Sequence, residues 1–195
     1  MKPIHKGAEA DIFLEKAFGR TLAVKARNPK RYRVESLDRS LRKTRTKREA
    51  KAMYLASRAG INVPALYAIG RFSMCMEWIE GKLMKDSRQK QSVYVDLGEQ
   101  LGLLHKAGIA HGDFTTANVL IKEGKPYLID FGLSEITTSI EEKAIDLILM
   151  KRSISKRDFS AMTGSYVKAY PDARKVLDRL SEIEERGRYK TRTLG

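Results

Sequence analysis

The chain has 195 residues, of which 38 are Lys or Arg and 24 are Asp or Glu, and its formal net charge is +14. This length accommodates one domain with a sizeable core, and an apolar content of 42% excludes wholesale disorder. The single cysteine, Cys75, excludes an internal disulfide and is typical of a reducing compartment. The chain shows no apolar signal-peptide stretch and no apolar run of membrane-spanning length, so we expect a cytoplasmic protein with no membrane partner.

Most of the excess charge lies in two segments. Residues 25–51 hold twelve Lys and Arg side chains against three Asp and Glu, and residues 186–195 hold four basic residues and no acid. Such clustering predicts a polyanionic partner, and nucleic acid is the first candidate. A solvated basic face or a thermophile surface would produce the same pattern.

The first 79 residues predict a small sheet and one long basic helix. Apolar and polar residues alternate in four strand-like runs, at 11–17, 21–27, 65–70 and 72–79. Between the second and third runs, a helix is expected from about 37 to 59, where Gly60 provides a C-terminal stop.

After Glu80-Gly81 the pattern becomes mostly helical. Helices are expected at 92–107, 140–152, 155–170 and 171–186, with a short strand pair at 119–122 and 126–130. We therefore expect an α+β fold with a β-rich lobe at 1–79, a helical lobe at 80–185 and a basic tail at 186–195.

The strand pair carries the most informative chemistry. Asn118 immediately precedes its first strand and Asp130 ends its second, so antiparallel pairing returns both to one end, with facing positions about 5 Å apart. An amide oxygen beside a carboxylate suits Mg²⁺, which prefers hard oxygen ligands. Asp113 lies five residues before Asn118, where its carboxylate could accept a proton from an attacking hydroxyl or water. The alternative is that Asp113 caps a turn and Asp130 is a polar strand end.

The segment from His111 to Asn118, followed by Asp130-Phe131-Gly132, resembles the catalytic loop and the metal-binding motif of protein kinases. By that resemblance, Lys25 would hold the nucleotide phosphates and Glu49 would orient it. The backbone of Glu77 and Ile79 would contact adenine at a hinge near 77–82. The nucleotide loop keeps one glycine, and its candidate ATP-binding residues are Ile4, Lys6, Gly7, Ala8, Glu9, Ala10 and Ile12.

The whole chain resembles the small atypical kinase subunits of the KEOPS complex in their archaeal stand-alone form. The matching segments are GAEADI (7–12), AVKAR (23–27), RTKREAKAM (45–53), AGINVPALYAIG (59–70), MEWIEG (76–81), HGDFTTANVL (111–120), IDFGLSE (129–135), EEKAIDL (141–147) and RGRYKTR (186–192). This resemblance implies a minimal two-lobed protein-kinase-like fold with a truncated activation segment.

The resemblance also implies a function. Subunits of this family bind ATP with Mg²⁺, phosphorylate serine or threonine and hydrolyse ATP within a complex that makes threonylcarbamoyl-adenosine in tRNAs reading codons that begin with A. The implied partners are the threonylcarbamoyl-transferase subunit and a small accessory subunit. The basic helix 37–59 and the tail 186–195 become candidate tRNA contacts. By the same resemblance, Asp113 is the catalytic base, Lys25 and Asn118 assist it, and Asn118 and Asp130 bind the metal.

Two departures from ordinary protein kinases qualify the expectation. Gly112 replaces the arginine of the catalytic loop, and only fifteen residues separate Asp130 from Asp146, with no A-P-E segment. The peptide-docking platform is therefore absent, which argues against a stand-alone protein kinase. Asp146, a charged residue among the apolar residues of the expected buried helix, should accept hydrogen bonds from backbone N–H groups of the catalytic loop. The remaining alternatives are a non-catalytic tRNA-binding scaffold and a small-molecule phosphotransferase.

Overall fold

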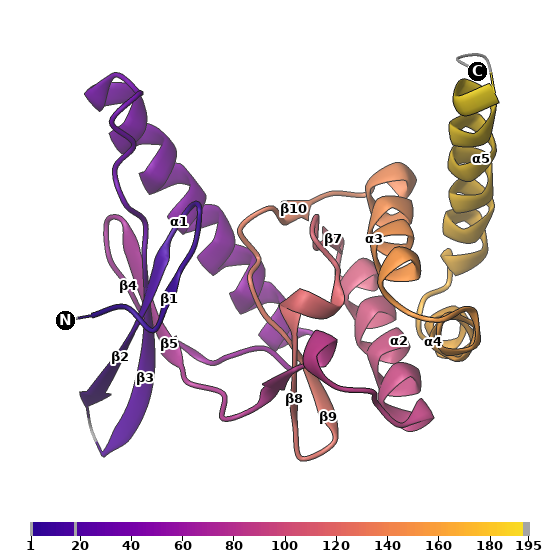
Figure 1. Cartoon of the computed structure of the whole chain (residues 1–195), viewed down its shortest axis with the longest axis horizontal. Coiled ribbons are helices and arrows are strands. Elements are labelled where there is room, and N and C mark those ends of the chain that lie inside the picture. Colours follow the sequence, from indigo (N-terminus) through magenta and orange to yellow (C-terminus); the bar gives the residue numbers. More distant parts are fainter. Residues whose placement is uncertain (1, 18, 193–195) are drawn as a thin grey trace.

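The computed structural model describes residues 2–17 and 19–192, with the backbone alone at 187–192. Its first part is a five-stranded antiparallel sheet in the order β1-β2-β3-β5-β4, flanked by one long helix, α1 (Figure 1). The elements of this N-terminal lobe are β1 (His5–Lys6), β2 (Asp11–Ala17), β3 (Arg20–Ala26), α1 (Glu35–Arg58), β4 (Leu66–Ile69) and β5 (Ser73–Glu77). All four predicted strands and the long helix are confirmed, with ends shifted by one to two residues.

Helix α1 presents one buried stripe to the sheet. Thr46, Glu49, Ala50 and Met53 recur at helical spacing and are almost fully buried, while most of the remaining surface of the helix is charged. Two acids, Glu35 and Asp38, lie in its first turn, where they interact favourably with the helix dipole. The stripe therefore brings one acidic side chain, Glu49, beneath the sheet.

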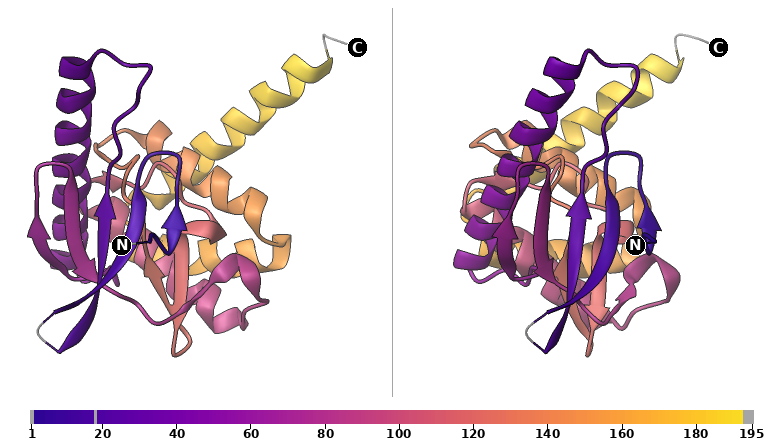
Figure 2. Two further views of the ribbon diagram at one scale, coloured as in Figure 1. Left: turned by 60° about the vertical axis from the view of Figure 1, so that its left-hand side comes forward. Right: turned by 90° about the vertical axis from the view of Figure 1, so that its left-hand side faces the viewer.

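The second lobe is built on three packed helices and a strand hairpin. Its elements are β6 (Lys82–Leu83), η1 (Met84–Asp86), α2 (Gln91–Lys106), β7 (Ile109–Ala110), η2 (Thr116–Asn118), β8 (Val119–Lys122), β9 (Lys125–Leu128), β10 (Glu135–Ile136), α3 (Ile140–Ser153), α4 (Lys156–Ala169) and α5 (Ala173–Arg192). Helices α2, α3 and α4 pack around Leu97, Leu101, Leu147 and Tyr166, which are completely buried. The first half of helix α5 packs into this core through Val176 and Leu180, and its C-terminal part projects away from the body of the molecule (Figure 2).

A backbone tether joins the two lobes at the end of α1. Asn62 accepts a hydrogen bond at its carbonyl from the N–H of Leu128 (2.8 Å) and donates from its side chain to the carbonyl of Pro126 (3.2 Å). Its own N–H donates to the side chain of Gln100 on α2 (2.6 Å). The helix that carries Glu49 is thereby attached to the hairpin that leads to Asp130.

Several features differ from the sequence-based expectation. Strand β9 ends at Leu128, so Asp130 does not end the strand: it lies two residues beyond it, with a positive φ of 60°. Strands β1, β6, β7 and β10 were not predicted, because two-residue strands carry no periodic signal. The expected tail at 186–195 begins inside α5, which continues to Arg192, and positions 193–195 lie outside the described residues. Over the described part of the chain, no helix is both long and apolar enough to cross a membrane.

Candidate active site

A chain of three ion-paired side chains joins the two lobes at their interface. The Lys25 amine on β3 lies 2.6 Å from Glu49 Oε1 on α1 and 2.7 Å from Asp130 Oδ1 beyond β9. Lys25 and Glu49 are buried, whereas about half of the Asp130 side chain is exposed. The predicted pairing of Lys25 with Glu49 is thus present, and the same amine also contacts the predicted metal ligand.

Glu49 has a second cationic partner that the sequence did not single out. Its other carboxylate oxygen, Oε2, accepts a hydrogen bond from Arg27 Nη2, and the Arg27 side chain is only 4% exposed. Arg27 stands two residues after Lys25 at the end of the same strand, and residues at that spacing project from one face of a sheet. The two-residue spacing could have indicated that Arg27 lies on the same face as Lys25. In the sequence, however, Arg27 stands out only as one of the basic residues of 25–51.

The Asp130 carboxylate is held in its ionised form. Burial alone would raise its pKa, but the Lys25 ammonium, through its charge and hydrogen bond, outweighs burial and holds the pKa of Asp130 below its ordinary value. The N–H of Gly132 also donates to Oδ1 (3.1 Å). Both hydrogen bonds use Oδ1, so within the described residues Oδ2 remains open for a cation.

Asp146 fixes the backbone at the start of the segment 111–118, which was predicted to be the catalytic loop. This fully buried carboxylate accepts hydrogen bonds from the N–H groups of His111 (2.6 Å) and Gly112 (2.8 Å), which confirms the prediction made for it. The ring of His105 lies 3.2 Å from the same carboxylate. Burial lowers the pKa of His105 and outweighs the attraction of Asp146, so the ring is neutral at pH 7.

Asp113 and Asn118 lie together at the open end of the hairpin. The side-chain amide nitrogen of Asn118 donates to Asp113 Oδ2 (2.7 Å) and to the Asp113 carbonyl (2.9 Å). These two hydrogen bonds set the orientation of the amide, so the side-chain oxygen of Asn118 remains free to coordinate a cation. The Asn118 carbonyl accepts a hydrogen bond from the N–H of Ile129 (3.0 Å), next to Asp130. Asn118 therefore faces Ile129 just beyond the last pair of the β8–β9 ladder, and Asp130 lies one residue past the position predicted to face Asn118.

The nucleotide loop forms a tight turn between β1 and β2. The N–H of Gly7 donates to the carbonyl of Ala10 (3.0 Å), and a Cβ at Gly7 would lie only 2.7 Å from that oxygen, so the turn requires glycine. The side chain of Glu9 pairs with Arg45 on α1 (2.5 Å), which keeps it from serving as a free phosphate contact. Of the other loop candidates, Ala10 is buried, while Ile4, Lys6 and Ala8 are exposed and Ile12 is half-buried.

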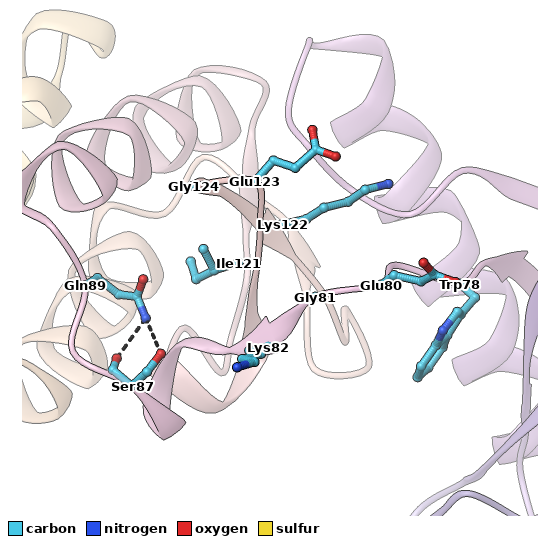
Figure 3. A pocket seen from close by; sticks show the side chains of 10 residues that line it. All are labelled: Trp78, Glu80, Gly81, Lys82, Ser87, Gln89, Ile121, Lys122, Glu123 and Gly124. Carbon is cyan, nitrogen blue, oxygen red and sulfur yellow. Dashed lines mark hydrogen bonds between the residues drawn. The ribbon is translucent and has the colours of Figure 1, made fainter.

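In the linker between the lobes, some backbone groups of Glu77 and Ile79 are hydrogen-bonded within the chain, and one N–H group has no partner among the described residues. Glu77 ends β5, where its N–H donates to the Ala65 carbonyl (2.8 Å), and the carbonyl of Ile79 accepts from the N–H of Gly81 (2.9 Å). The N–H of Ile79 has no partner among the described residues. A cavity of about 660 Å³ lies beside the linker and is open to solvent, lined by residues such as Trp78, Lys82 and Lys122. Figure 3 shows Gln89 donating two hydrogen bonds to Ser87 at its edge.

Comparison with known proteins decides the family. A model of the RIO domain matches residues 16–169. The chain is 38% identical over 216 aligned residues to the KEOPS complex subunit Bud32 of Pyrococcus abyssi, covering 99% of this chain and 98% of that protein. The chain belongs to the RIO-domain family, among its Bud32 members.

Two further comparisons bear on the architecture. The chain is 36% identical to a probable bifunctional tRNA threonylcarbamoyladenosine biosynthesis protein of Methanobrevibacter smithii, of whose length it spans 36%. Its fold matches the Rio2 kinase of Chaetomium thermophilum, solved as an ADP/Mg²⁺-phosphoaspartate complex, with a TM-score of 0.69 at 19% identity over 95% of this chain and 70% of that one. The expected two-lobed, protein-kinase-like α+β fold is therefore confirmed, and the RIO-domain family supplies the kinase-like frame for the site.

Proposed function

We propose that the chain binds ATP with Mg²⁺ between its lobes and acts as an atypical serine/threonine kinase and ATPase within a KEOPS complex. The observation that carries the proposal is the continuous contact from Glu49 through Lys25 to Asp130. This contact places the Lys25 ammonium group beside the Asp130 carboxylate, the predicted metal ligand, at the interface of the two lobes. The kinase resemblance gives the same three positions these roles. We place the lobe boundary at 79/80, within the linker between β5 and β6.

The donor set fits a magnesium ion shared with phosphates. Asp130 offers an open carboxylate oxygen and Asn118 an open amide oxygen, and both are hard ligands. Over the described residues, no group of three or more His, Cys, Asp or Glu side chains forms a closed metal site. The bound ion would neutralise charge on the phosphates, and its two protein ligands leave positions for phosphate oxygens and water.

The other residues of the site have distinct proposed roles. Lys25 binds phosphate oxygens, and Glu49 orients it. Asp113 keeps one carboxylate oxygen on Asn118 and turns the other toward the nucleophile, a serine or threonine hydroxyl or a water, whose proton it accepts. The backbone of Glu77 and Ile79 contacts adenine, and the loop residues Ile4, Lys6, Gly7, Ala8, Glu9, Ala10 and Ile12 cover the phosphates, Glu9 only after leaving Arg45.

The complex and its substrate follow from the relatives. The P. abyssi relative is named as a KEOPS subunit, and the M. smithii relative as a threonylcarbamoyladenosine biosynthesis protein. We infer that this chain supports the same tRNA modification alongside a threonylcarbamoyl-transferase subunit and a small accessory subunit. The short segment from Asp130 to α3, which holds only β10, supports action inside a complex over phosphorylation of free peptides.

Loss of either aspartate tests the proposed reaction. Asp113→Ala removes the proton acceptor and should lower ATP turnover about 100-fold or more. Asp130→Ala should abolish turnover and also weaken binding of Mg²⁺-nucleotide, because it removes a metal ligand. Steady-state phosphate release and autophosphorylation would be measured, with Asp172→Ala as the control, since that half-buried acid has Lys175 as its ion-pair partner within the described part of the chain. Full activity in either site variant would refute the assignment.

A further inference from the structure

Arg27 is a buried cation that the proposed reaction does not use. Its side chain is 4% exposed, and its N–H donates to the Phe72 carbonyl (2.9 Å), so it prolongs the pairing of β3 with β5. Its Nε is buried and has no hydrogen-bond partner among the described residues. Burying an unsatisfied donor is unfavourable, so the hydrogen bond from Arg27 to Glu49 has to offset that cost.

The contact with Arg27 balances the buried negative charge of Glu49. Glu49 is 1% exposed, and its two carboxylate oxygens are divided between two cations, Oε1 to Lys25 and Oε2 to Arg27. If Lys25 were its only partner, any shift of the amine toward nucleotide phosphates would leave a buried carboxylate unpaired, which is strongly unfavourable. That cost would oppose nucleotide binding. With Arg27 in place, Glu49 stays paired wherever the Lys25 amine goes.

Arg27 is also next to the segment that carries Asp130. Its Nη2 atom lies 3.4 Å from the position that a Cβ on Gly132 would occupy, and the Glu49 carboxylate lies 3.8 Å from the same position. The four side chains Lys25, Arg27, Glu49 and Asp130 therefore form one cluster with two positive and two negative charges. Without Arg27 the cluster would carry a net negative charge beside the place assigned to phosphates.

We propose that Arg27 is a positioning residue that holds Glu49 through its second oxygen, so that Lys25 is free to bind nucleotide phosphates. This inference rests on the proposed nucleotide binding. Arg27 acts on Lys25 only through Glu49, and its removal should weaken nucleotide binding only while Glu49 is present.

A double-mutant cycle tests that dependence. Arg27→Met and Arg27→Lys would each be made in the wild-type and the Glu49→Gln chains, and the dissociation constant of a non-hydrolysable ATP analogue with Mg²⁺ would be measured by calorimetry. We expect about a tenfold loss of affinity for Arg27→Met, equivalent to about 1.4 kcal/mol, and a smaller loss for Arg27→Lys, which keeps the charge. In the Glu49→Gln background, either change should alter affinity less than about twofold.

Urea unfolding of the same variants, without nucleotide, separates positioning from simple stability. The control is Arg20→Met, which removes an exposed arginine from the start of the same strand. Lower stability with unchanged nucleotide affinity would overturn the inference, as would equal losses of affinity in both backgrounds. If Arg27→Met fails to fold, the Arg27→Lys pair decides by the same criterion. A wild-type chain that binds no nucleotide would instead refute the proposed function itself.

Discussion

Five residues of the site follow directly from sequence motifs. Asp113, Asn118 and Asp130 were predicted from their order and spacing, and Lys25 and Glu49 from the resemblance to protein kinases. The structure places the five in two contact groups linked by the backbone beside Ile129. Spacing works here because a hairpin and a strand–helix pair bring set positions together.

The sequence does not predict which charged side chains form ion pairs with one another. Glu9 was expected near the phosphates but pairs with Arg45, and Arg27 was counted as part of a basic run although it is buried on Glu49. Each depends on which of several nearby cations reaches a given carboxylate, and that choice is made by tertiary packing.

Gly112 is the residue where the departure from ordinary kinases has a physical reason. Its φ is +79°, and a Cβ there would lie 2.3 Å from the carbonyl oxygen of Leu133, so no side chain fits. We expect Gly112→Ala to destabilise the fold by about 3 kcal/mol, from backbone strain and a forced shift of the Leu133 segment. Urea unfolding would measure this loss.

Gly124→Ala is the matched control for that change. Gly124 has nearly the same φ, +77°, but a Cβ there would meet nothing within 4 Å. It should therefore lose only about 1 kcal/mol, the cost of strain alone. Equal losses for the two variants would show that the close approach of Leu133 to Gly112 is not what requires glycine.

At the scale of elements, length decided what could be predicted. Helix α1 and strands β2 and β3 have long periodic patterns and were placed to within two residues, whereas β7 and β10, two residues each, were missed. Asp130 was assigned to a strand end because its apolar neighbours continue the strand pattern, but its left-handed backbone turns the chain out of the ladder at that point.

Between residues 39 and 51, helix α1 separates its basic residues into two sets. Its arginines at 39, 42, 45 and 48 are each ion-paired with an acid, whereas Lys43, Lys47 and Lys51 are exposed and make no ion pair among the described residues. Spaced four residues apart, these lysines form one continuous stripe. Unpaired cations in a row suit a phosphate backbone, so the stripe is the part of the basic helix that we assign to tRNA.

Neutralising the stripe tests this assignment. The triple variant Lys43→Gln, Lys47→Gln, Lys51→Gln should weaken tRNA binding and reduce the slope of log affinity against log salt by about two. Filter binding across a salt series would measure both. The control replaces three exposed, unpaired lysines of the second lobe, Lys106, Lys125 and Lys156. Equal losses in the control would mean that only overall charge matters.

At the scale of the whole molecule, two of the contacts between the lobes join residues that lie far apart in the sequence. Asn62 bonds the end of α1 to β9, and Lys25 bonds β3 to Asp130. Both links involve residues more than sixty positions apart, and no local pattern specifies such partners.

The C-terminal end of α5 offers the last test, because it extends beyond the packed core. Val176 and Leu180 pack against the second lobe, whereas Arg186 is exposed and residues 186–195 carry four basic residues without an acid. Ending the chain after Glu185 should reduce tRNA affinity and its salt dependence while changing stability by no more than about 0.5 kcal/mol. A full-length chain with glutamine at these four basic positions should show the same loss if charge is responsible. Unchanged tRNA affinity and salt slope in the shortened chain would remove this end of α5 from the tRNA surface.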